Sequence, residues 1–88
     1  MFNGPQETVT LTFDDALINA MFDKFGEDIP MERVDEHTCR VTVPVRVSPI
    51  FFGWVFQFGD LMRVTGPEGI VKEYLDWARK ACGEDHEG

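Results

Sequence analysis

Apolar and polar side chains alternate in two stretches of the chain, and each stretch predicts a strand with one buried face. Residues 9–13 alternate apolar side chains with threonines, and residues 39–47 place a cysteine and four valines at every other position. This period of two is typical of a half-buried strand. Pro44 lies inside the second stretch and cannot donate a ladder hydrogen bond, so it belongs at a sheet edge or a bulge. If this strand is central, we expect a bulge there or fraying of the ladder before residue 48.

Three other stretches repeat apolar side chains at spacings of three and four residues, which predicts amphipathic helices. The first follows Asp14, a candidate N-cap, and the second follows Ser48 with a proline at its first helical position. The third follows residues 66–67, and a glycine stands at the end of each stretch. We expect the inward face of the second helix to consist of five side chains: Ile50, Phe51, Trp54, Val55 and Phe58.

Two shorter strands are expected at residues 31–35 and 61–65, with a hairpin turn at residues 35–37 before the second long strand. The resulting order is strand, helix, strand, strand, helix, strand, helix. This order predicts an α+β fold of the ferredoxin-like class, a split βαββαβ sandwich with an additional C-terminal helix. We expect a boundary or linker segment at residues 1–8, one domain at residues 9–82 and a polar tail at residues 83–88.

The charge of the chain narrows the range of partners. Sixteen acidic residues face eight basic ones in 88 residues, for a formal net charge of −8. Because binding to phosphate backbones requires clustered Lys and Arg, we expect no direct contact with nucleic acid. No apolar run approaches the roughly 18 residues of a membrane span, and no signal peptide is visible. Two cysteines, Cys39 and Cys82, are too few for a disulfide framework, and we expect a cytoplasmic protein with both thiols reduced.

No arrangement of residues predicts catalysis, a metal site or a cofactor. His37 and Cys39 are close in sequence but lack a third residue that would orient them, and His86 in the tail has no evident partner. The adjacent carboxylates at residues 14–15 and 35–36 are explained by helix capping and turn formation. Residues 66–69 lack the lysine of a phosphate-binding loop. We therefore expect a protein that is not an enzyme.

The outer face of the second helix is the first candidate for a binding surface. Phe52 and Phe56 lie four residues apart on the side opposite the inward face, with Gly53 and Gln57 beside them. An exposed aromatic pair of this kind favours a contact with a partner or a neighbouring domain. The alternative is that the third helix folds over the two phenylalanines.

The outward face of the sheet is the second candidate. Thr10, Thr12, Arg40, Thr42 and Arg46 are expected to point away from the helices, and Arg33 and Arg63 join them if the strand register allows. Arg40 and Arg46 are candidates for binding an anion or a small acidic ligand. No aromatic side chain is expected on this face, so a sheet that stacks RNA bases is disfavoured.

Residues 47–59, with their Gly-Trp and Phe-Gly pairs, are followed by Leu61-Met62-Arg63-Val64 and by Pro67. With the strand at residues 9–11 and the helix end at residues 23–26, this pattern resembles the C-terminal extension, or WCX domain, of WYL-domain transcriptional regulators. The resemblance covers residues 9–82. It implies a non-catalytic dimerisation and regulatory domain of a bacterial DNA-binding regulator, which transmits the state of an effector.

The same resemblance implies a fragment. Regulators of that family also carry a helix-turn-helix and a WYL domain, and neither is present in these 88 residues. The expected partners are a second copy of the chain or the WYL domain of the same regulator. The competing hypothesis is a small-molecule or anion sensor that binds on the open face of the sheet.

Overall fold

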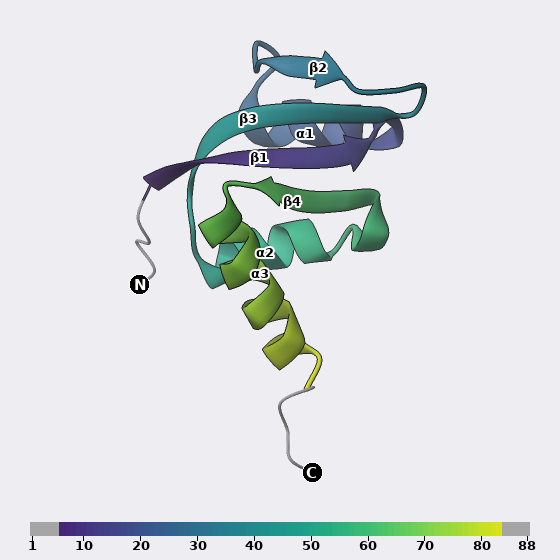
Figure 1. The fold of residues 1–88 in the computed structure, drawn as a ribbon. Coiled ribbons are helices and arrows are strands. Elements are labelled where there is room, and N and C mark those ends of the chain that lie inside the picture. The colour runs from purple at the N-terminus through teal and green to yellow at the C-terminus, as the bar shows by residue number, and fades with distance from the viewer. Residues whose placement is uncertain (1–5, 84–88) are drawn as a thin grey trace.

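The computed structural model describes residues 6–83 and shows an α+β fold in which helices pack on an antiparallel sheet (Figure 1). The described chain forms four strands and three helices: β1 (Gln6–Asp14), α1 (Ile18–Phe25), β2 (Met31–Arg33), β3 (Thr38–Arg46), α2 (Pro49–Phe56), β4 (Met62–Gly66) and α3 (Glu68–Ala81). Short 3₁₀ turns at Asp15–Leu17 and Gly59–Leu61 precede α1 and β4. The strand order is β2-β3-β1-β4, and every neighbouring pair is antiparallel. The expected α+β class is confirmed.

One face of the sheet forms the core, and the other is open. In β3 the odd-numbered residues from Cys39 to Val45 are buried, while the even-numbered residues from Arg40 to Arg46 are exposed. Helices α1 and α2 cover the buried face, and Figure 1 shows α1 behind β3 and β1. The rings of Phe25 and Trp54 join the two helices edge to face, with centroids 5.6 Å apart. The apolar side chains of the alternating strands and those of the helices, spaced three and four residues apart, therefore pack into one shared core.

The helix boundaries follow from local chemistry at their first residues. The Asp14 carboxylate accepts a hydrogen bond from the Ala16 N–H at the start of the 3₁₀ turn that leads into α1. The Ser48 hydroxyl accepts from the Phe51 N–H at 3.3 Å, and Pro49 occupies the first position of α2. Each cap satisfies a backbone donor that has no partner within its helix. The Ser48 prediction is confirmed, whereas Asp14 caps the 3₁₀ turn and the residue before α1 itself is Leu17, which has no side-chain cap.

Pro44 is accommodated without a bulge in β3 and without fraying. The β1–β3 ladder runs without a break from Gln6 opposite Arg46 to Asp14 opposite Thr38. The Thr38 carbonyl accepts hydrogen bonds from the chain that follows β2, whereas the His37 carbonyl accepts from Asp15 next to β1. Even-numbered residues of β3 therefore direct their backbone groups toward β2, because these directions alternate along a strand.

The side of Pro44 that lacks an N–H consequently faces the edge of β3 where β2 has already ended. β2 pairs with β3 only as far as Val41. No ladder hydrogen bond is lost at Pro44, which is exposed. The irregularity of the sheet lies instead between Thr10 and Leu11, in the pairing of β1 with β4. The two accommodations expected for this proline in a central strand are both wrong.

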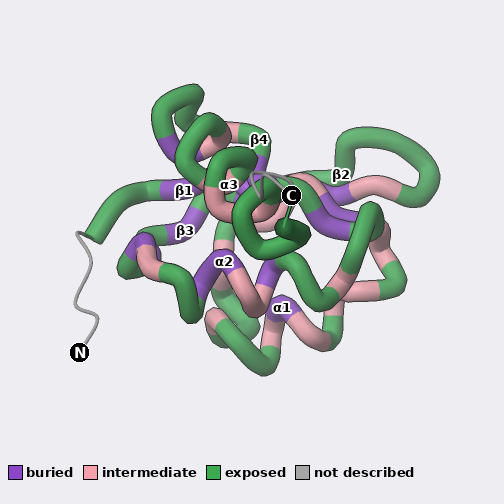
Figure 2. The backbone as a smooth tube through the Cα atoms, turned by 90° about the horizontal axis from the view of Figure 1, so that it is seen from below, coloured by how far each residue is buried: buried purple, intermediate pink, exposed green. Residues whose placement is uncertain are grey.

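Helix α3 is attached to the body by one side only. Ile70 is its single buried residue, while Leu75 is 52% exposed. Figure 2 shows buried segments in β1, β3 and α2, whereas most of the tube of α3 is exposed or intermediate. Figure 1 shows α3 leaving the end of β4 and running away from the sheet. The helix therefore covers part of the core with one side, while the rest of its surface remains accessible.

Three further expectations need correction or placement. The first strand begins at Gln6 rather than at residue 9, because it pairs with β3 along its whole length. Ile50 is 68% exposed rather than inward, and it lines a hollow together with Pro44 and Arg46 of β3. Of the expected tail at residues 83–88, the structure describes only Gly83. Residues 84–88, which include His86, lie outside the described residues.

The two cysteines have opposite environments. Cys39 is 2% exposed in the middle of the core, and Cys82 is exposed after the end of α3. Both are free thiols in the described part of the chain.

Candidate functional site

Phe52 is not part of an exposed surface, and this expectation is wrong. It is 5% exposed, and its ring lies against two rings of α3, with centroids 5.3 Å from Tyr74 and 5.9 Å from Trp77. The alternative, in which the third helix folds over the outer face of α2, holds for this residue. The cause is tertiary: α2 is apolar on nearly every side, and α3 packs on one of those sides.

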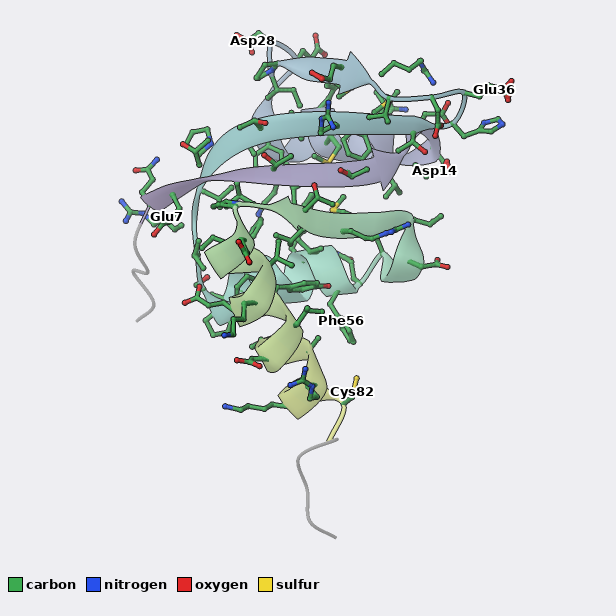
Figure 3. All side chains as sticks on the ribbon, viewed as in Figure 1. Glu7, Asp14, Asp28, Glu36, Phe56 and Cys82 are labelled. Atoms are coloured by element: carbon green, nitrogen blue, oxygen red, sulfur yellow. The ribbon has the colours of Figure 1, made fainter. Side chains whose placement is uncertain are left out.

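The other three residues of the predicted surface remain accessible, and we call them the α2 patch: Gly53, Phe56 and Gln57. Phe56 is 41% exposed, although the edge of its ring contacts Trp77 at 5.5 Å between centroids. Figure 3 shows Phe56 on the side of α2 turned away from β4. Gln57 is exposed, and Gly53 is half-buried. These positions share one helix side, because they are separated by three and four residues.

A hollow adjoins the α2 patch between α1 and α2. It has a volume of about 360 Å³ and is lined by Ala20, Asp23, Lys24, Trp54, Gln57 and Phe58. The Lys24 ammonium lies 5.2 Å from the centroid of the Trp54 ring, a cation–π distance. The hollow and the patch together form an uneven surface with apolar and polar parts, which suits a protein partner better than a flat polar face does.

The open face of the sheet carries threonines joined across strands. The Thr10 and Thr42 hydroxyls lie 3.2 Å apart, and those of Thr12 and Thr65 lie 2.8 Å apart. The expectation that Thr10, Thr12 and Thr42 lie on this face is confirmed, since their neighbours along the strands are buried.

The two arginines chosen as anion ligands lie on the open face but do not converge. Arg40 and Arg46 are six residues apart in β3, a separation of about 20 Å along an extended strand. The Arg40 guanidinium donates to the Glu32 carboxylate at 2.7 Å. At this separation a single small anion cannot contact both arginines at once. Whether either residue binds an anion alone stays a prediction.

The strand register decides which other arginines share that face. Arg63 lies opposite Thr12 on β4 and is exposed, so it belongs to the open face. Arg33 lies opposite Cys39 and instead binds the turn after β2, donating to the carbonyls of Asp35 and Glu36. The sequence contained no signal for this difference, because register depends on pairing between strands that are distant in the chain.

The structure places His37 and Cys39, the pair considered in the sequence, in different environments. Cys39 is buried, and the His37 side chain is 78% exposed in the turn before β3. No group of three or more His, Cys, Asp or Glu residues among those described is placed to hold a metal ion. The structure also contains, in the same range, no helix with the length and apolar character needed to cross a membrane.

A comparison with protein families gives a match over most of the chain. The model of the WCX domain family matches residues 5–82, which is nearly the whole chain. No curated protein and no solved structure matches the chain.

Proposed function

The chain belongs to the WCX domain family, and from this membership we propose that it is the non-catalytic, C-terminal regulatory domain of a WYL-family transcriptional regulator. The observation that carries the proposal is the family match over residues 5–82. In this proposal the chain is a fragment of a bacterial, cytoplasmic regulator whose DNA-binding and WYL domains lie outside it. The domain passes the state of an effector to those parts through protein contacts, not through chemistry of its own.

The same proposal includes the finer description of the fold as ferredoxin-like. Two observations support it: the element order β1-α1-β2-β3-α2-β4 and the strand order β2-β3-β1-β4 with antiparallel neighbours. In this description α3 is an appendage to the split βαββαβ unit.

We propose that the α2 patch is the surface through which two copies of the domain associate. Phe56 supplies an apolar side chain that the fold leaves 41% exposed. Gly53 supports the proposal in a different way. A glycine inside a helix costs about 1 kcal/mol relative to alanine, yet a Cβ at this position would meet no atom within 4 Å. The fold itself therefore gives no reason for a glycine, whereas close approach of a second backbone would.

Sedimentation equilibrium of the chain over a wide concentration range tests this proposal. We expect a reversible dimer that Phe56→Asp weakens by at least about tenfold, the change in the equilibrium constant that 1.4 kcal/mol produces. Val34→Asp is the matched control, because Val34 is 47% exposed in the turn after β2, away from α2. Phe52 is unsuitable as a test position, since it is part of the core. A monomer at every concentration would reject self-association.

Gly53→Ala separates stability from association. Because the new methyl group meets open space within the domain, we expect the variant to be more stable by about 0.5–1 kcal/mol. We expect the same variant to dimerise more weakly, since the methyl group would separate two closely packed helices. A variant that is more stable and dimerises as well as the original chain would remove Gly53 from the contact surface. Docking to a WYL domain added in trans is then the remaining role for the patch.

A further inference from the structure

Two arginines face each other across the central strand β1 on the open side of the sheet. Thr12 of β1 is paired with Arg40 of β3 on one side and with Arg63 of β4 on the other. Neighbouring strands lie about 4.8 Å apart, so the Cα atoms of Arg40 and Arg63 are about 10 Å apart. We call Arg40, Thr12 and Arg63 the arginine row. Both arginines are exposed, and their long side chains can converge above Thr12.

The two guanidinium groups of the row are available to a ligand. Within residues 6–83, Arg63 has no ion pair and no hydrogen bond from its side chain. Arg40 has one carboxylate partner, Glu32, at 2.7 Å, and the two side chains are 47% and 60% exposed. Ion pairs this exposed contribute little free energy, so an incoming anion can replace the carboxylate.

A cavity adjoins the row at its Arg63 end. Its volume is about 160 Å³, and its polar lining comes from Thr12, Asp14, His37, Thr38, Asp60 and Arg63. The Thr12 hydroxyl, which lies 2.8 Å from that of Thr65, adds a short polar group between the arginines. The lining therefore combines the Arg63 guanidinium and the hydroxyls of Thr12 and Thr38 with the carboxylates of Asp14 and Asp60, which are hydrogen-bond acceptors.

We propose that the arginine row and this cavity bind a small ligand with an oxyanion head, either phosphate or carboxylate, and a body that donates hydrogen bonds. The two guanidinium forks match the geometry of an oxyanion, and Arg binds such groups in a bidentate way. Asp14 and Asp60 accept hydrogen bonds from amine, amide or hydroxyl groups of the ligand body. The same carboxylates, in a chain of net charge −8, disfavour extended polyanions.

This site lies apart from the α2 patch. The arginine row is on the open face of the sheet, whereas α2 packs against the buried face. Ligand binding does not rest on the self-association proposed above. A failure of either proposal therefore leaves the other intact, and separate measurements report on each.

Amide and arginine-side-chain NMR spectra of the whole chain test the site. The probes are inorganic phosphate, acetate and adenosine monophosphate, added at constant ionic strength kept by sodium chloride. We expect saturable shifts centred on Thr12, Arg40 and Arg63. We expect the nucleotide to bind more tightly than inorganic phosphate, because its amino and hydroxyl groups can reach the carboxylates of the cavity.

Four variants make the result specific. We expect Arg63→Ala to weaken nucleotide binding at least about tenfold, and Arg63→Lys, which keeps the charge without the fork, to weaken it less. Glu32→Gln is expected to tighten binding, because it removes the carboxylate that competes for Arg40. Arg46→Ala is the matched control, because Arg46 lies on the same face of β3 but six residues along the strand from Arg40. Thermal unfolding of each variant verifies that the fold is kept.

The proposal fails if none of the three probes gives saturable shifts. It also fails if Arg46→Ala and Arg63→Ala weaken binding equally, because the shifts would then report only general electrostatic attraction. A single-stranded oligonucleotide that binds more tightly than the mononucleotide would assign the face to a polyanion instead.

Discussion

The ring of Trp77 on α3 lies 5.9 Å, centroid to centroid, from that of Phe52 on α2, and this contact ties the last helix to the body of the domain. Trp77 also contacts Phe56 and stacks with Tyr74 at an interplanar angle of 14°. Because Ile70 is the single buried residue of α3, the attachment of this helix depends mainly on the aromatic group.

Trp77→Ala is therefore expected to destabilise the domain. Full burial would cost about 3–5 kcal/mol on truncation, and the partial exposure of Trp77 reduces this to about 2 kcal/mol. Urea unfolding followed by circular dichroism measures the change. Leu75→Ala on the same helix is the control, with a change within about 0.5 kcal/mol, because Leu75 is 52% exposed. Equal effects from both variants would mean that α3 is not held by the aromatic group.

Ser48→Ala removes the N-cap of α2. The Phe51 N–H loses its acceptor, and we expect the free energy of unfolding to fall by about 1 kcal/mol. Ser48→Asp, which keeps an acceptor oxygen, is expected to stay within a few tenths of a kcal/mol of the original chain. The same chemical denaturation measures both variants, and an unchanged Ser48→Ala would show that the cap contributes nothing.

The turn between β2 and β3 is expected to weaken in acid. The His37 backbone N–H donates to the Asp35 carboxylate at 3.0 Å, and this bond, with a second from Thr38, holds the pKa of Asp35 below its ordinary value of 3.8. A pKa depressed by folding stabilises the fold above 3.8, and this stabilisation is lost as the pH falls through the folded pKa.

A carboxyl titration by NMR measures this pKa directly, and a value at or above 3.8 would contradict the assignment. Unfolding measured across this pH range gives the matching stability. Asp35→Asn cannot titrate, so the stability advantage of the original chain over the variant is expected to shrink as the pH falls below 3.8.

Pro44→Thr is expected to change stability little, because the restored N–H faces an edge of β3 where no ladder partner lies. The physical consequence is intermolecular, since the new donor completes an edge to which another strand can add. Light scattering during prolonged incubation is expected to rise relative to the original chain. Val43→Pro is the contrasting change, because the N–H of Val43 faces β1 and its loss disrupts the ladder. Comparable losses of stability from both changes would contradict the assigned edge.

The sequence predicted the local features of this chain well. The alternating strands, the cap at Ser48 and the α+β class all depend on neighbouring residues, and the structure confirms them. The sequence left the burial of Phe52 open between two alternatives, because it depends on which side of α2 the third helix packs. The sequence also contained no reason to prefer Arg63 to Arg46 as the second arginine of the candidate anion site. Residues 12 and 63 become neighbours only through the register of β1 and β4.

Because Cys39 is buried and Cys82 is exposed, the rate of thiol labelling at Cys39 can report how often the core of the domain opens. A thiol reagent reaches the exposed Cys82 at once, whereas Cys39, 2% exposed between the sheet and the helices, reacts only when the core opens. The slow second labelling event in the native chain therefore counts openings of the core without any denaturant. The rate of this reaction can be followed while a ligand or a second copy of the chain is added. Any partner that binds only the folded domain stabilises it and therefore slows labelling of the Cys39 sulfur, even without contacting that atom.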